Sequence, residues 1–151
     1  MSRAVSVRYG DQVSTFQKLE HARREPSNVQ LFRYCAVTWN AHRIHYDAAY
    51  AATEGYPNVL VQSHLHGAFI TSYCTDWMGQ AGRLERLEYS VRRYACPGDV
   101  LTCRGEVTGS EPDARPGYQR ITLKVSEVRE SDEVECAIGE ATIILPRRPE
   151  V

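Results

Sequence analysis

The stretch SHLHGAFITSYCTDWM, residues 63–78, decides the fold. Its apolar side chains recur near the period of an α-helix and it carries few charges, which predicts a helix that is largely buried. An apolar helix of this length needs a second layer of structure to cover it. The chain on either side of the helix shows what that layer is. The apolar positions are Leu65, Ala68, Phe69, Tyr73 and Trp77.

The chain after residue 83 shows the alternation typical of β-strands. Turn signals separate the strands: Pro97-Gly98-Asp99 is one, and residues 111–117, with two prolines, form a loop. The last strand is nearly all apolar, as is typical of a strand inside a sheet. Helices followed by strands predict an α+β domain, in which an antiparallel sheet wraps around the helix at 63–78. The predicted strands are 84–91 (with an irregularity), 100–107, 121–125 and 137–145.

Two shorter helices precede the long one. The first covers about residues 29–38. The second has clear boundaries, because Asp47 can cap its start, residues 48–54 are mostly strong helix formers, and Gly55 can end it.

The first 28 residues are polar and weakly patterned, with one expected strand from Val5 to Arg8. We therefore divide the chain into a leading segment (1–28), a single domain (29–146) and a short tail (147–151). A chain of 151 residues is long enough for one domain with a substantial core.

Composition excludes several classes of protein. The net charge is −1 and no basic block stands out, which argues against a nucleic-acid partner. The N-terminus has no apolar signal region, and no apolar run approaches the length of a membrane span. Five cysteines, an odd number without a Cys-x-x-Cys pair, indicate free thiols in a reducing cytoplasm.

The segment TWNAHRIHYD, residues 38–47, gathers polar and titratable side chains between two short helices. Loops held between rigid elements often carry function. His45 titrates near neutral pH and can take or give a proton. Asn40 cannot act as a base, but its amide can orient a water molecule or a hydroxyl group.

This segment resembles the hydratase motif of MaoC-like proteins and (R)-specific enoyl-CoA hydratases, which runs Asp-x-Asn-Pro-apolar-His and is followed by a helix. Asn40 stands at the position of the motif's Asp, His42 at its Asn, Arg43 at its Pro and His45 at its His. The string is similar to a subgroup related to mesaconyl-CoA hydratases, in which Asn usually replaces the catalytic Asp.

Other stretches resemble the same family: 56–61, the Pro-Gly-Asp segment at 93–101, and the last strand at 139–146. Together the resemblance covers about residues 30–146. It implies a single hotdog domain, at least a dimer, and a tunnel for an acyl thioester between two subunits.

The start of the long helix departs from the family pattern. The family often has His-Gly there, whereas this chain has Gln62-Ser63, followed by His64. In the family, a backbone N–H at this helix start holds the thioester carbonyl oxygen. The resemblance therefore places Ser63 at the oxyanion site, with Gln62, His64 and His42 as candidate substrate contacts.

The reaction implied is the reversible addition of water to a 2-enoyl thioester of coenzyme A or acyl carrier protein. His45 is the expected acid and base, Asn40 orients the water or hydroxyl, and the N–H near Ser63 stabilises the enolate oxygen. The chemistry requires no metal or redox cofactor.

Three alternatives stay open. A hotdog thioesterase would need a carboxylate that activates water at the carbonyl. A non-catalytic subunit would pair with a second, active hotdog subunit. His42-x-x-His45 and His64-x-His66, with Asp47, could imitate a metal site, although neither spacing is diagnostic.

Overall fold

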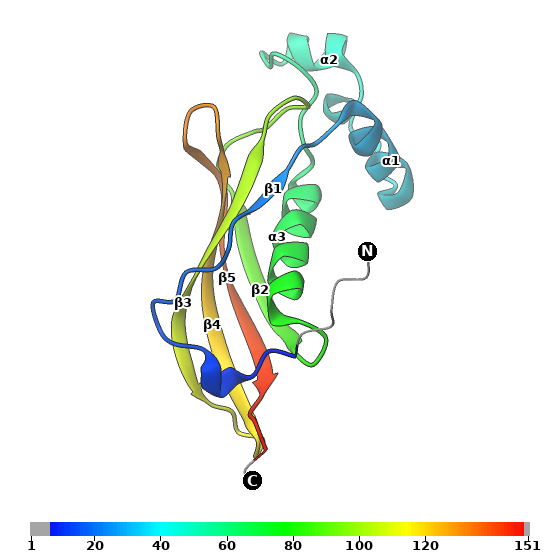
Figure 1. Ribbon diagram of the computed structural model, residues 1–151. Coiled ribbons are helices and arrows are strands. Elements are labelled where there is room, and N and C mark those ends of the chain that lie inside the picture. The colour runs from blue at the N-terminus through cyan, green and yellow to red at the C-terminus, as the bar shows by residue number, and fades with distance from the viewer. Residues whose placement is uncertain (1–6, 150–151) are drawn as a thin grey trace, which may run out of the picture.

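The computed structural model describes residues 7–149 (Figure 1). Helices occupy the first half of the chain and long strands the second, as the sequence predicts. In order, the elements are η1 (Gly10–Gln12), β1 (Ala22–Arg24), α1 (Asn28–Thr38), η2 (Arg43–His45), α2 (Ala48–Thr53), α3 (Ser63–Met78), β2 (Arg83–Val91), β3 (Leu101–Pro112), β4 (Tyr118–Arg129) and β5 (Val134–Pro146).

One antiparallel sheet of five strands, in the order β1-β3-β4-β5-β2, curves around α3 (Figure 1). Inward-facing side chains of β4, such as Ile121, Leu123 and Val125, are almost fully buried against the helix side. The strand that follows α3, β2, lies at one edge of the sheet, and the three-residue β1 lies at the other. The predicted α+β architecture, a sheet wrapped around a central helix, is therefore confirmed.

The central helix forms where the sequence predicts it, over Ser63–Met78. Gln62 is extended (φ −64°, ψ 142°) and begins the helix, while Gly79 ends it with a positive φ of 71°. Gly67 lets the helix approach the sheet closely, because a Cβ there would lie 2.3 Å from the ring of Tyr89 on β2. The helix and the edge strand thus pack in direct contact at this residue.

The shorter elements agree with the sequence in part. Asp47 caps α2 by accepting the Tyr50 N–H, and β2 has its irregularity, a register shift between Leu84 and Arg86. The strand expected from residue 100 to residue 107 continues to Pro112. β1, which lies inside the leading segment, was not predicted. Of the strand expected at 5–8, residues 5–6 lie outside the described residues, and residues 7–8 are not in a strand.

The helix α1 stands away from the sheet, beside the start of α3 (Figure 1). It buries only Leu31 and Cys35. The segment α1–η2–α2 therefore overhangs the N-terminal end of the central helix, and this is where the polar motif at 38–47 lies.

Candidate active site

The loop that carries the motif is shaped by its own side chains. Trp39 ends α1 in the left-handed conformation (φ 56°). Asn40 Oδ1 then accepts the N–H of His42 at 3.2 Å, and His42 Nδ1 accepts the N–H of Ile44 at 3.3 Å. These local bonds turn the chain into η2 and place His45 at its end.

His45 is held by one hydrogen bond to the backbone. Its Nδ1 lies 2.8 Å from the carbonyl oxygen of Leu60. A carbonyl only accepts, so Nδ1 carries the proton and Nε2 is left with a free lone pair. Within residues 7–149, Nε2 has no hydrogen-bond partner. This is the tautomer that a general base requires.

Burial also favours the neutral form of this histidine. Removal of the half-buried ring from water lowers the pKa of His45, the bond to Leu60 opposes the lowering, and the nearby His42 adds to it. At neutral pH the side chain is therefore uncharged and ready to accept a proton at Nε2.

The start of α3 supplies the second part of the site. The carbonyl of Gln62 accepts the N–H groups of Leu65 and His66, at 2.9 and 3.1 Å. The N–H groups of Ser63 and His64 have no acceptor in the described part of the chain. Both residues are exposed, and a helix start with free N–H groups attracts negative charge.

Backbone hydrogen bonds bring these two parts together. Leu60 donates its N–H to the carbonyl of Ile44 at 3.0 Å and accepts the bond from His45. Leu60 stands three residues before Ser63, so the loop with the motif at 38–47 is tied to the chain that enters α3. Sequence reasoning missed Leu60, because its part is played by backbone atoms that leave no signal in the side-chain pattern.

The other residues predicted from the sequence lie in different surroundings: His42 is exposed, Asn40 is half-buried and Gln62 is fully buried. The ring of His42 lies 5.9 Å from that of His45, between centroids, and is exposed. Asn40 is half-buried, and its amide oxygen is engaged by the His42 N–H. Gln62 is fully buried and turns towards α1, where it donates to the Leu31 carbonyl at 2.9 Å and to Cys35 Sγ at 3.0 Å.

The carboxylate of Asp47 is already occupied. It caps α2 through the Tyr50 N–H at 3.0 Å and pairs with Arg43 at 2.6 Å. The Tyr50 N–H and the Arg43 guanidinium hold the pKa of Asp47 below its usual value. Among residues 7–149, no group of three or more His, Cys, Asp or Glu is arranged to hold a metal ion.

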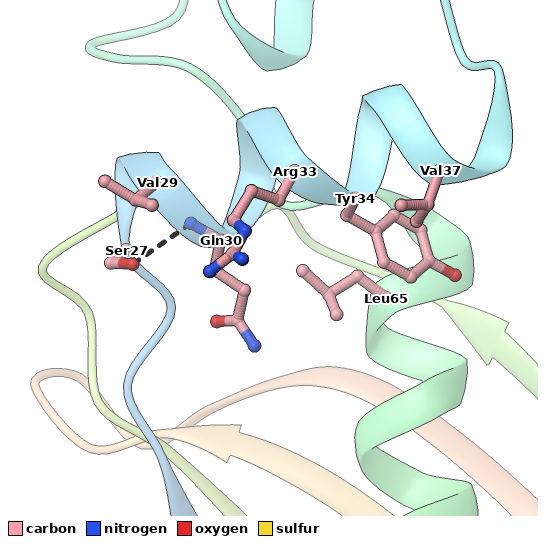
Figure 2. A pocket seen from close by; sticks show the side chains of 7 residues that line it. All are labelled: Ser27, Val29, Gln30, Arg33, Tyr34, Val37 and Leu65. Carbon is pink, nitrogen blue, oxygen red and sulfur yellow. Dashed lines mark hydrogen bonds between the residues drawn. The ribbon is translucent and has the colours of Figure 1, made fainter.

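A hollow opens between α1 and the start of α3 (Figure 2). Its volume is about 460 Å³. Leu65 of α3 faces the side chains of α1 across it, and Leu65 lies within the turn that carries the free N–H groups. Sequence reasoning did not single out this hollow. The lining residues are Ser27, Val29, Gln30, Arg33, Tyr34, Val37 and Leu65.

Residues 6–97 match the family of hydroxyacyl-thioester dehydratase type 2, Htd2. This range is more than half of the chain and contains the motif at 38–47 and the whole of α3. The chain belongs to the Htd2 family. Within the described residues of this Htd2-family protein, no helix is long and apolar enough to span a bilayer.

Two curated proteins resemble parts of the Htd2-family chain. Mesaconyl-C(4)-CoA hydratase of Chloroflexus aurantiacus is 58% identical over 36 residues, 23% of this chain and 13% of that protein. The mitochondrial hydroxyacyl-thioester dehydratase type 2 of Schizosaccharomyces pombe is 44% identical over 68 residues, 44% of this chain and 23% of that protein. The matched segments thus span less than a quarter of either relative.

Solved structures confirm the hotdog fold of this Htd2-family chain. R-hydratase PhaJ1 from Pseudomonas aeruginosa, unliganded, superposes with a TM-score of 0.82 at 22% identity, over 95% of this chain and 90% of that one. The ChsH1-ChsH2 complex from Mycobacterium tuberculosis superposes with a TM-score of 0.74 at 18% identity, over 90% of this chain and 100% of that one. A double-hotdog protein from M. tuberculosis superposes with a TM-score of 0.78 at 19% identity, over 96% of this chain but only 46% of that one. This chain therefore corresponds to a single hotdog domain. At these identities the likeness concerns the fold alone.

Proposed function

We propose that this Htd2-family protein catalyses the reversible addition of water to a 2-enoyl thioester, or its removal from a 3-hydroxyacyl thioester. One observation carries the proposal: a neutral histidine with a free Nε2, His45, is tied through Leu60 to a helix start that presents two free N–H groups. A base beside an oxyanion site is the arrangement that this reaction needs.

In the hydration direction, Nε2 of His45 takes a proton from water while the water oxygen forms a bond to Cβ. The electrons of the double bond move towards the thioester carbonyl, whose oxygen becomes enolate-like. The N–H groups of Ser63 and His64 receive that negative charge. The protonated His45 then returns the proton to Cα, so that the side chain is regenerated. Dehydration follows the same steps in reverse.

Asn40 is assigned to orient the water or the 3-hydroxyl through its amide NH₂ group. Its oxygen is used to shape the loop, which leaves the nitrogen side to face a ligand. An amide does not accept a proton at neutral pH, so His45 alone moves the proton.

We assign the hollow between α1 and α3 to the acyl thioester. One of its lining residues, Leu65, belongs to the turn of α3 that carries the free N–H groups, and Tyr34, Val37 and Leu65 give it an apolar wall. Gln30 and Arg33 add polar groups from α1. Thioesters of coenzyme A and of acyl carrier protein share the same reacting carbonyl, and both are substrates to be tested.

We also infer that the active form contains at least two hotdog subunits. β2 lies at an edge of the sheet and, within the described chain, pairs only with β5, while the end of α1 and the residue after it expose large apolar side chains, with Val37 81% and Trp39 92% exposed. Edge strands and apolar patches of this kind are usually covered by a partner. The partner is a second copy of this chain, or else a second hotdog subunit.

The test is turnover of crotonyl-CoA and longer enoyl-CoAs by the purified protein, followed through the absorbance of the enoyl thioester. Wild-type protein should hydrate them, and His45→Ala should be slower by roughly two to four orders of magnitude, the usual contribution of a positioned acid or base. If wild-type protein releases free thiol instead, the enzyme is a thioesterase. If it does neither, the chain is a non-catalytic subunit and the proposal is wrong.

A further inference from the structure

The buried side chains of α3 change in character along the helix. Beyond the first turn, the side chains packed against the sheet are Phe69, Ile70 and Cys74, together with Tyr73. Apolar packing has no preferred direction, so it fixes the rotation of a helix about its axis less sharply than a directional hydrogen bond does. At the helix start, by contrast, two polar side chains are fully buried: Gln62 and His66.

These two side chains tie the helix start to two different elements. Gln62 donates to the Leu31 carbonyl and to Cys35, both on α1. His66 shares a hydrogen bond through Nδ1 with Oε1 of Glu127, on the central strand β4. Ser63 and His64, whose N–H groups are free, lie between the two anchors in the sequence.

The His66–Glu127 pair joins residues 61 positions apart and is fully enclosed, since both side chains have no exposed surface. The sheet is irregular at this point, because the β4–β5 register shifts between Glu127 and Val128. Such shifts re-aim side chains, and here both neighbouring residues are buried. The strand thus departs from regular pairing where the helix is anchored.

The anchors leave buried polar atoms without partners. Within the described residues, His66 Nε2, Glu127 Oε2 and Gln62 Oε1 are buried without a hydrogen-bond partner. A buried ionisable pair with unsatisfied atoms is often no more stable than an apolar pair of similar size. We therefore expect the pair to fix the geometry of the helix start, next to the two free N–H groups, rather than to stabilise the fold.

We propose that His66 and Glu127 are positioning residues that fix the rotation of the first turn of α3, and so aim the Ser63 and His64 N–H groups at the thioester oxygen. This inference rests on the proposed function. Neither residue touches the substrate. Their effect reaches the reaction through the direction of the two N–H groups, which matters most when negative charge develops on the oxygen.

The experiment compares three variants with wild type in the crotonyl-CoA assay. The double variant His66→Leu/Glu127→Leu removes the hydrogen bond and both unsatisfied atoms. We expect a Tm equal to or above that of wild type, a kcat lower by roughly 10- to 100-fold, and a KM within about threefold. His66→Asn/Glu127→Gln keeps a hydrogen bond between neutral amides, and we expect it to retain most of the wild-type kcat.

Tyr73→Phe is the matched control. Tyr73 lies two turns along the same helix and also buries a polar atom, its hydroxyl, without a partner. Its removal should leave kcat and KM unchanged.

Each outcome decides the proposal. It is overturned if the Leu/Leu variant keeps wild-type kcat, if the amide pair loses as much kcat as the Leu/Leu variant, or if Tyr73→Phe loses kcat as well. If the Leu/Leu variant does not fold, the single variant His66→Leu takes its place, and wild-type kcat in folded His66→Leu protein overturns the proposal. A wild-type enzyme that is active and depends on His45, with unaffected anchor variants, would overturn the positioning role and leave the proposed function standing. An inactive wild type would overturn both.

Discussion

At the scale of single residues, the state of His45 determines how the enzyme should respond to pH. Burial lowers the pKa of this side chain below its usual value of about 6.5. In the proposed reaction the neutral form of His45 is the base, so activity should be present above the folded-state pKa and lost as the pH falls through it. We expect kcat/KM for hydration to rise with pH through a single ionisation below about 6.5 and then to stay level. A bell-shaped profile would show that a second titrating group takes part.

Asn40 gives a second test at this scale. Asn40→Ala should lower kcat without moving the ionisation, because an amide orients but does not titrate. Asn40→Asp adds a negative charge near His45 and should raise the pKa of His45, which moves the rising limb of the profile to higher pH. If Asn40→Ala keeps full activity and the wild-type profile, Asn40 does no more than shape the loop through His42.

At the scale of elements, the close approach of α3 to β2 depends on Gly67. A methyl group there would meet the Tyr89 ring at 2.3 Å, so Gly67→Ala should destabilise the protein by roughly 1–3 kcal/mol through overpacking. Urea unfolding measures this change. The second substitution Tyr89→Ala should then cost less in the Gly67→Ala background than in wild type, because the clash disappears with the ring. Strictly additive effects would show that the ring moves aside freely.

The elements also show what the sequence could and could not predict. The helix at 63–78 and the Asp47 cap were predictable, because period and capping are local properties. β1 was not predictable, since Ala22–Arg24 has no alternating apolar pattern and forms a strand only through pairing with β3. For the site, the motif predicts His45 and the resemblance at 62–64 predicts the helix start, and both stay predictions. The contact through Leu60, the inward turn of Gln62 and the His66–Glu127 pair all depend on tertiary structure.

At the scale of the whole molecule, the apolar side chains of α1 predict association. Light scattering at micromolar concentration should show at least a dimer. The side chain of Trp39, at the end of α1, is 92% exposed in the single chain. Trp39→Glu places a charge there and should shift the protein towards monomer. The control is Ser131→Glu, at an exposed position in the turn between β4 and β5. It adds the same charge and should leave the oligomeric state unchanged. A stable wild-type monomer would contradict the expectation.

The segment α1–η2–α2, which overhangs the start of α3, has a consequence for heat inactivation. α1 buries only Leu31 and Cys35, whereas the sheet and α3 share a continuous core. Segments with little buried surface open locally at a lower free energy than the whole domain unfolds. His45 is carried by this overhang, so on warming the enzyme should stop turning over while the circular dichroism of the sheet is still intact. The temperature that halves the activity would then report the detachment of one helix rather than the melting of the fold.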